Sequence, residues 1–369
     1  MKSVISLYKE YILPTVLLGS LTVGAGMFAL PYLFSRSGLL VGSIYLVLFT
    51  LIFIKINRAY AEIISKHSEK YRFASYAKEH LGWLGFWAAI VAVVLGLLLT
   101  LTIYIILSTS FWHLISSSGL GISGYIFWAL SSLAIIFSLK RLLNLDTILS
   151  IAMIVIIFVI FLLGMRHGIP TINSDYSLSG LFLPYGAVLF ALYGRAAIAP
   201  LEDYYKSAGL DWKKVNVPII LGTAIPAVLF FLFAVGVMGL SPFGVTPDAV
   251  SGIFNGTLLS LPMLGILGLL TIWTSYLIIG TEIKDILSND LKLHDVLALV
   301  VVSVVPIVLY FINVGSFISL ISLAGAVFLA IECILVILMH GKLKGGLSLL
   351  DKLIICLFIA GALHAFVVG

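Results

Sequence analysis

Gly19 to Pro31 reads GSLTVGAGMFALP and lies inside the first long apolar segment of the chain. Glycine weakens a helix, and in the run Gly24, Ala25 and Gly26 no bulky side chain shields the backbone. Unpaired backbone N–H and C=O groups in hydrocarbon cost several kcal/mol each unless they line a polar cavity. The stretch therefore predicts a broken membrane helix whose exposed backbone faces a ligand near the middle of the membrane.

The composition is that of a polytopic membrane protein. Hydrophobic residues make up 62% of the 369 residues, charged residues only 10%, and the mean hydropathy is +1.21. A membrane-spanning helix needs roughly 20 apolar residues. The chain contains eleven candidate spans, at 11–33, 38–60, 84–112, 121–139, 145–164, 180–201, 216–239, 258–283, 296–312, 317–339 and 353–368. The last is the shortest, and a re-entrant or interfacial segment is the alternative there.

The cations predict the orientation, because short cytoplasmic loops accumulate Lys and Arg. A cytoplasmic N-terminus places all but three of the 21 Lys and Arg residues on the cytoplasmic side. The exceptions are Arg36 and Arg166 outside and Arg195 within the sixth span. We predict a multi-pass protein of the plasma (inner) membrane, with the N-terminus cytoplasmic and the C-terminus extracellular. The net charge of +5 then reports topology and not nucleic-acid binding.

The sixth span repeats the irregularity of the first. Pro184 to Pro200 reads PYGAVLFALYGRAAIAP, with Gly194 near its middle. Close helix packing is the alternative role for such glycines, but two interrupted spans, five helices apart, are typical of an inverted-topology repeat with a binding site between the breaks. We predict one transmembrane domain over 1–369, with repeat one at about 11–164, repeat two at about 180–339 and an extra helix at 353–368.

Three stretches carry a resemblance to a known family. They are GSLTVGAGMFALPYLFSRSG (19–38), FALYGRAAIAP (190–200) and TIWTSYLIIGTEIKDIL (271–287). They resemble the hydroxy and aromatic amino acid permeases, which are relatives of the amino acid/auxin permeases in the amino acid, polyamine and organocation superfamily. The resemblance implies an all-α leucine-transporter fold, with a 5+5 inverted repeat, broken helices 1 and 6 and eleven transmembrane helices. It also implies a substrate held between the two breaks.

An amino acid site needs donors for the carboxylate and acceptors for the ammonium, and broken helices supply both from the backbone. We expect the amides around Ala25 and Gly26 to bind the carboxylate. Carbonyls near Thr22, Phe190 and Ala191 would bind the ammonium. The predicted function is that of an ion-coupled secondary transporter of neutral or aromatic amino acids, by alternating access.

The substrate side chain needs a pocket of its own. We expect Leu192, Tyr193 and Gly194 to shape it, beside the exposed Gly24 of the first break. Tyr104 in the third span is a candidate lid on the outer side. A core or lipid-facing position is the alternative for Tyr104.

The coupling ion is Na⁺ or H⁺. By resemblance, Thr274 and Ser275 fall where the leucine-transporter fold places a sodium, completed by carbonyls near Ser20 and Val23. Thr271 lies on the same helical face, and the alternative is that these hydroxyls bond to their own helix. Some proton-driven relatives carry a lysine in the fifth span, which this chain lacks, whereas bacterial permeases of this kind usually move protons.

Ionisable groups within spans are costly and are functional candidates by default. Arg195, Glu282 and Glu332 stand out as coupling or gating residues. If Arg195 pairs with either glutamate, protonation of that carboxylate would loosen an internal contact. A permanent structural salt bridge is the alternative. The family that this chain resembles usually has an apolar or small residue near the position of Arg195. Because the arginine departs from that pattern, the resemblance alone does not fix the substrate class.

Other functions fit the sequence less well. A transporter-like amino acid sensor or an exchanger is the main alternative, and an ion channel would need pore-lining charge or a carbonyl filter. No grouping of His, Ser or Asp points to an enzyme, since His113, His167, His294 and His364 are scattered. We expect no cofactor, an amino acid substrate, the lipid bilayer and no nucleic acid as partners; the oligomeric state is not indicated.

Overall fold

The computed structural model describes residues 6–67, 72–116, 121–137, 143–168, 178–253 and 261–368. Every regular element among these residues is helical, which confirms the prediction of an all-α protein. In chain order the elements are η1 (Tyr8–Ile12), α2 (Leu13–Thr22), η2 (Ala25–Ala29), α3 (Leu30–Ser37), α4 (Leu39–Ser65), α5 (Phe73–Ile115), α6 (Ser123–Ile136), α7 (Leu143–His167), α8 (Leu178–Phe182), α9 (Tyr185–Ala191), η4 (Arg195–Ala197), α10 (Ile198–Ser207), η5 (Trp212–Val215), α11 (Asn216–Leu240), α12 (Leu261–Asn289), α13 (Asp295–Phe311), α14 (Phe317–Leu323), η6 (Ala324–Leu329), α15 (Ala330–Lys344) and α16 (Leu349–Val368).

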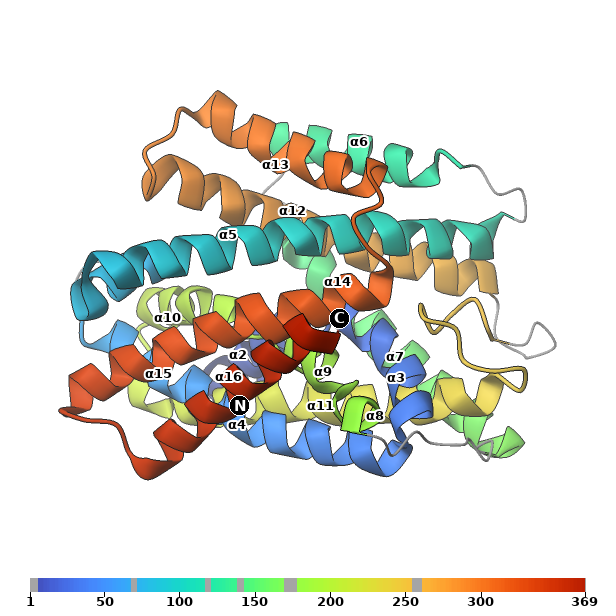
Figure 1. Ribbon diagram of the computed structural model, residues 1–369, viewed down its shortest axis with the longest axis horizontal. Helices are drawn as coiled ribbons and strands as arrows, with labels where there is room; N and C mark the ends of the chain where they lie inside the picture. The colour runs from blue at the N-terminus through green and yellow to red at the C-terminus, as the bar shows by residue number, and fades with distance from the viewer. Residues whose placement is uncertain are drawn as a thin grey trace.

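The long helices lie side by side along the long axis of the molecule (Figure 1). Helices α6 and α13 pair along one edge, α5 and α12 form the next layer, and α4 and α11 lie toward the opposite edge. The two broken helices, α2 with α3 and α9 with α10, lie between these layers. Their breaks are therefore surrounded by other helices.

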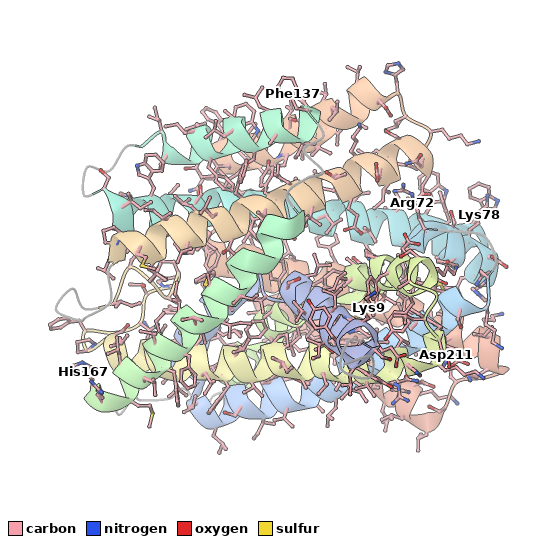
Figure 2. The ribbon with its side chains drawn as sticks, turned by 180° about the vertical axis from the view of Figure 1, so that it is seen from behind. Lys9, Arg72, Lys78, Phe137, His167 and Asp211 are labelled. Carbon is pink, nitrogen blue, oxygen red and sulfur yellow. The ribbon has the colours of Figure 1, made fainter. Side chains whose placement is uncertain are left out.

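Glycines allow close contacts between neighbouring helices. A Cβ placed on Gly164 of α7 would collide with the backbone of Gly236 in α11, and one on Gly239 would collide with Gly164. Small residues allow two backbones to approach in this way, which is how membrane helices gain packing contacts without a hydrophobic driving force. Helix α7 crosses the rear face of the molecule over α11, as Figure 2 shows.

Each of the eleven predicted spans contains helix, but the helices differ in length. Six described helices are long and apolar enough to cross a membrane alone, and the bent pair Tyr8–Thr22 with Ala25–Ser37 makes seven. Three further apolar helices are shorter, at Ser123–Ile136, Ile151–His167 and Asp295–Phe311. The number of eleven membrane crossings therefore stays a prediction.

Several helices extend beyond the apolar stretches that predicted them. The last stretch, at 353–368, belongs to the 20-residue helix α16, which begins at Leu349. Ser348 and Asp351 form a capping box there, since Asp351 N donates to Ser348 Oγ and Ser348 N donates to Asp351 Oδ2. A capping box starts a helix on polar residues, which a search for apolar runs does not include. Lys55 of α4 pairs with Asp351 and holds this end of α16.

Charged side chains gather at one end of the molecule. Figure 2 shows Arg72, Lys78 and Asp211 at that end and His167 at the other. Ion pairs join the helix ends there, including Lys214 Nζ to Glu10 Oε2 at 2.8 Å and Arg72 Nη2 to Asp285 Oδ2 at 3.5 Å. This distribution is the one expected if most of the cations lie on one side of a membrane.

Candidate functional site

The first break separates α2 from η2, as the glycine-rich stretch predicts. Helix α2 ends at Thr22, and Val23 and Gly24 are extended, with ψ of 95° and −157°. The segments on either side are bent by 52°. The first hydrogen bond of η2 runs from Met27 N to Gly24 O, at 3.4 Å. The amides of Ala25 and Gly26 thus have no acceptor inside η2, and a helix that starts in this way presents free N–H groups.

The second break lies between α9 and η4. Helix α9 ends at Ala191, and Leu192 to Gly194 leave the helical conformation before η4 begins at Arg195. Leu192 N still donates to Val188 O at 3.0 Å, and Ala197 N donates to Gly194 O at 3.1 Å. This break is at the position that the sixth-span glycine predicts.

The two breaks touch each other. A Cβ on Gly26 would lie 2.5 Å from Ala191 Cα, and a Cβ on Gly194 would lie 2.7 Å from Thr22 Oγ1. Both positions therefore need glycine for close approach. Close helix packing, the alternative role considered for these glycines, is thus present at both breaks, and the binding role stays a prediction.

A cavity of about 80 Å³ lies between the breaks. Most of the predicted substrate residues line it, namely Thr22, Gly24, Ala25, Gly26, Tyr104, Phe190, Tyr193 and Gly194. Ala191 and Leu192 do not; they are buried behind it, where Ala191 supports Gly26. Lining residues that sequence reasoning missed come from several helices, namely Leu21, Leu97, Thr100, Ala196, Ala197, Ile278, Ile279 and Leu329.

Tyr104 lies beside the first break. Its Oη is 3.4 Å from the position that a Cβ on Gly24 would take, and the residue is 4% exposed. The side chain is therefore at the cavity and not on the lipid-facing surface. Whether it acts as a lid stays a prediction.

Arg195 is paired with Glu332 in the interior. Its Nη2 lies 2.7 Å from Glu332 Oε2, and its Nε donates to the same oxygen at 2.8 Å. Tyr193 Oη donates to Glu332 Oε2 at 2.7 Å and accepts from Arg195 Nη2 at 2.5 Å. The two charged side chains are 5% and 1% exposed. The network ties the second break to α15, which follows the π-helix η6.

Aromatic rings cover the guanidinium. Its Cζ lies 4.1 Å from the ring centroid of Phe73 and 5.5 Å from that of Tyr60. A cation over a ring face is attracted by the ring quadrupole, most strongly where water is excluded. Glu332 Oε1 is buried and has no hydrogen-bond partner among the described residues.

Glu282 takes a different position from Glu332. It is half-buried, and it has no hydrogen bond or ion pair within the described part of the chain. It lines both the cavity between the breaks and a larger vestibule of about 490 Å³. Leu21, Ala196 and Ile278 also line both the cavity and the vestibule. The vestibule also contains Arg72, Arg195 and several acidic residues at the charged end of the molecule, namely Glu202, Asp203, Asp285 and Asp290.

The predicted ion ligands are distributed over α2 and α12. Thr271 and Thr274 are buried, and their Oγ1 atoms donate to Leu267 O and Thr271 O at 2.8 and 2.9 Å. Ser20 Oγ donates to Leu17 O at 3.1 Å. In Ser20 and Thr271 a hydroxyl that donates to its own helix keeps its acceptor lone pairs. Val23 is buried and Ser275 half-buried, and the sodium site stays a prediction.

Asn57 is a further polar residue near the second break. It is 0% exposed in α4, and its Nδ2 donates to Thr223 Oγ1 at 3.3 Å. Its Oδ1 is buried without a partner among the described residues, and its Nδ2 lies 3.8 Å from a Cβ built on Gly194. The signal that could have identified it is an amide inside an otherwise apolar span. Within the described ranges, no three His, Cys, Asp or Glu side chains form a group that could hold a metal ion.

Solved transporter structures share this fold. The manganese transporter of Eremococcus coleocola, in complex with an aromatic bis-isothiourea substituted compound, is 14% identical with a TM-score of 0.64, and the match covers 98% of this chain and 86% of that one. Mhp1 in its inward facing conformation is 12% identical with a TM-score of 0.62, and the match covers 96% and 88%. At such identities the likeness shows the fold alone, and it confirms the predicted transporter fold in outline.

The sequence itself identifies the family. No curated protein matches the chain. The family match is nevertheless nearly complete in length and includes both breaks and α12. Residues 8–356 match the tryptophan/tyrosine permease family, so the chain belongs to this family of membrane transporters for aromatic amino acids, as its resemblance to the aromatic amino acid permeases predicted.

Proposed function

We propose that the protein is an ion-coupled symporter that carries neutral or aromatic amino acids by alternating access. One observation carries the proposal: residues of both breaks line a single cavity, with Gly24, Ala25 and Gly26 on one side and Phe190, Tyr193 and Gly194 on the other. Breaks in two membrane helices cost free energy unless the freed backbone N–H and C=O groups find other hydrogen-bond partners. A zwitterionic ligand supplies such partners.

The substrate would be held by its charged groups at the breaks. The amides of Ala25 and Gly26 would donate to the carboxylate, helped by the positive end of the helix dipole. Carbonyls near Thr22, Phe190 and Ala191 would accept from the ammonium. The free amides at the start of η2 support this assignment.

The two breaks would belong to the two halves of an inverted repeat. Repeat one runs from about residue 11 to 164 and repeat two from about 180 to 339, with α16 outside both. The correspondence of the α2–η2–α3 and α9–η4–α10 arrangements supports this division, because each is a helix interrupted before a 3-10 turn. In such folds one bundle rocks against the other around a fixed site.

We place the vestibule on the cytoplasmic side of the plasma membrane. Its rim contains Arg72 and Asp285, at the end of the molecule where the ion pairs gather. A cytoplasmic N-terminus and an extracellular C-terminus follow from the positive-inside rule. The vestibule would then be the route by which substrate leaves the cavity.

Coupling would run through the ion pair of Arg195 and Glu332. Protonation of Glu332 would remove its charge, weaken its contacts with Arg195 and Tyr193, and free the second break to move. The buried, unpartnered Oε1 supports this role, because it offers a place for the proton. Glu282, which lines the route between cavity and vestibule, would assist as a gating residue.

Sodium coupling is the competing proposal. It would use Thr274 and Ser275 with carbonyls near Ser20 and Val23, and the burial of Thr274 supports it. Hard cations such as sodium are bound by hydroxyl and carbonyl oxygens. The Thr274→Val variant removes one such oxygen at nearly constant volume.

The test is uptake of labelled tryptophan, tyrosine, phenylalanine and leucine into proteoliposomes, with sodium and pH gradients imposed separately. We expect saturable uptake that a pH gradient drives above equilibrium, in the wild type and in Thr274→Val alike. Loss of sodium-driven uptake in Thr274→Val, with no response to a pH gradient in the wild type, would favour sodium. Absence of saturable uptake of any amino acid under either gradient would contradict the proposal.

A further inference from the structure

The walls of the cavity differ in chemistry. The breaks supply backbone groups and are flanked by Leu21, Ala196 and Ala197, whereas the remaining lining comes from α5 and α12 and from Leu329 of η6. If an amino acid binds with its carboxylate and ammonium at the breaks, its side chain must point toward that remaining lining. This wall is largely apolar, with Leu97, Ile278 and Ile279, and suits an aromatic ring.

Glu282 is the exception in this wall. Among the described residues that line the cavity, it alone carries a formal charge. Arg195, which the sequence offers as a partner for either glutamate, is engaged by Glu332 through two contacts of 2.7 and 2.8 Å. Glu282 therefore keeps its acceptor oxygens unused within the described structure. An unpaired acceptor in a membrane interior is costly, so a donor supplied by the ligand would stabilise the site.

Tryptophan and tyrosine share a feature that phenylalanine lacks. The indole N–H and the phenol O–H are hydrogen-bond donors at the far side of the ring, away from the amino acid backbone. We propose that the Glu282 carboxylate accepts this ring-borne donor and so selects aromatic amino acids that carry one. This inference rests on the proposed transport function and adds to it a specificity-determining residue.

Physical chemistry gives the size of the effect. A site built to hydrogen-bond a substrate group rejects the analogue that lacks it, because the buried polar group is left unpaired. Glu282 is partly hydrated from the vestibule. We therefore expect the affinity for a ligand with the ring donor to exceed that for its analogue by roughly tenfold to a hundredfold, which is below the largest affinity ratios known for closed sites.

The experiment measures equilibrium binding to the purified full-length protein, without any ion gradient. The ligands are tryptophan, 1-methyltryptophan, whose indole nitrogen has no hydrogen, tyrosine and phenylalanine. The wild type should bind tryptophan at least about tenfold more tightly than 1-methyltryptophan, and tyrosine at least about tenfold more tightly than phenylalanine. Because phenylalanine is smaller than tyrosine, poor steric fit does not explain its weaker binding.

Substitution of Glu282 should abolish this preference. In Glu282→Leu both ratios should fall to within about threefold, and in the isosteric Glu282→Gln, which keeps one acceptor oxygen, they should fall to intermediate values. Asp285→Asn is the matched control, since Asp285 is one turn further along α12 and lines only the vestibule. Its ratios should equal those of the wild type.

Three results would overturn the inference. In the first, the wild type binds 1-methyltryptophan and phenylalanine as tightly as tryptophan and tyrosine. In the second, the ratios in Glu282→Leu and Glu282→Gln equal those of the wild type. In the third, both variants weaken every ligand by one common factor, which would place Glu282 beside the ammonium. Binding of no amino acid at all would instead overturn the transport proposal itself.

Discussion

Arg195 and Glu332 form a buried ion pair, with 2.7 Å between Arg195 Nη2 and Glu332 Oε2, across 137 positions of sequence. The pair joins the second break, which borders the cavity, to α15. Helix α15 itself does not line the cavity, whereas Leu329 of the preceding η6 does. Tyr193 bridges both partners. The contact therefore holds the break in one conformation.

Removal of one partner should destabilise the protein strongly. Glu332→Ala leaves the guanidinium buried without a counter-charge, which costs about 3–5 kcal/mol in buried pairs. We expect a large drop in the thermal unfolding temperature in detergent, and a smaller drop in the double variant Arg195→Met with Glu332→Ala than the two single variants predict in sum. Lys344→Ala is the control, because its pair with Glu62 is half exposed and should contribute at most about 1 kcal/mol. If the losses of stability in the two single variants add up to the loss in the double variant, Arg195 and Glu332 are not energetically coupled.

Neutralisation of Glu332 without loss of volume should uncouple transport. Glu332→Gln resembles the protonated side chain, so under the proposed mechanism a proton could no longer change the state of the break. We predict that this variant still exchanges labelled tryptophan against internal tryptophan but no longer accumulates it under a pH gradient. The measurement compares counterflow with gradient-driven uptake in the same proteoliposomes. Full gradient-driven accumulation in Glu332→Gln would rule out this residue as the coupling site.

The two glycines of the first break should respond differently to alanine. A Cβ on Gly26 would lie 2.5 Å from Ala191 Cα, so Gly26→Ala must displace the second break and should lower the unfolding temperature. A Cβ on Gly24 meets only Tyr104 Oη, at 3.4 Å, and Gly24 has φ of −138°, which any residue adopts. Gly24→Ala should therefore fold normally but weaken tryptophan binding, because its methyl group projects into the cavity. Equal stability and equal binding in both variants would contradict the placement of the cavity.

The pH dependence of stability should contain a contribution from Asp290, which follows α12 at the vestibule. Burial raises the pKa of its carboxyl to about 6 from the ordinary 3.8, although Arg72 acts in the opposite direction. Between these values the folded protein keeps a proton that the unfolded chain releases, so stability falls as the pH rises toward 6 and stays reduced above it. Asp290→Asn should thus raise the unfolding temperature near neutral pH and much less near about pH 4. A gain of the same size at both pH values, or none, would contradict this assignment, and Asp285→Asn, with a side chain 48% exposed, is the control.

The position of each break could be predicted from the sequence, because glycine within an apolar segment leaves backbone groups that lipid does not tolerate. Gly24 to Gly26 and Gly194 give the breaks within a residue or two. The apolar stretches also locate the helices, but not their polar ends. The capping box of Ser348 and Asp351 lies outside the apolar run that predicts α16.

The partners of the charged residues could not be predicted. Arg195 had two candidates, Glu282 and Glu332, and only the three-dimensional packing of α12 and α15 decides between them. The buried amide of Asn57 and its contact with Thr223 depend in the same way on how α4 meets α11. Spacing along one helix says which residues share a face, whereas contacts between helices depend on register and crossing angle.

An experimental structure with tryptophan bound would test most directly whether an amino acid site lies between the two broken helices. We predict the carboxylate within hydrogen-bonding distance of the amides of Ala25 and Gly26, with Arg195 still paired to Glu332. The indole should point toward α12, with its N–H near Glu282. Tryptophan bound away from both breaks, or with its carboxylate on Arg195 in place of Glu332, would contradict this prediction.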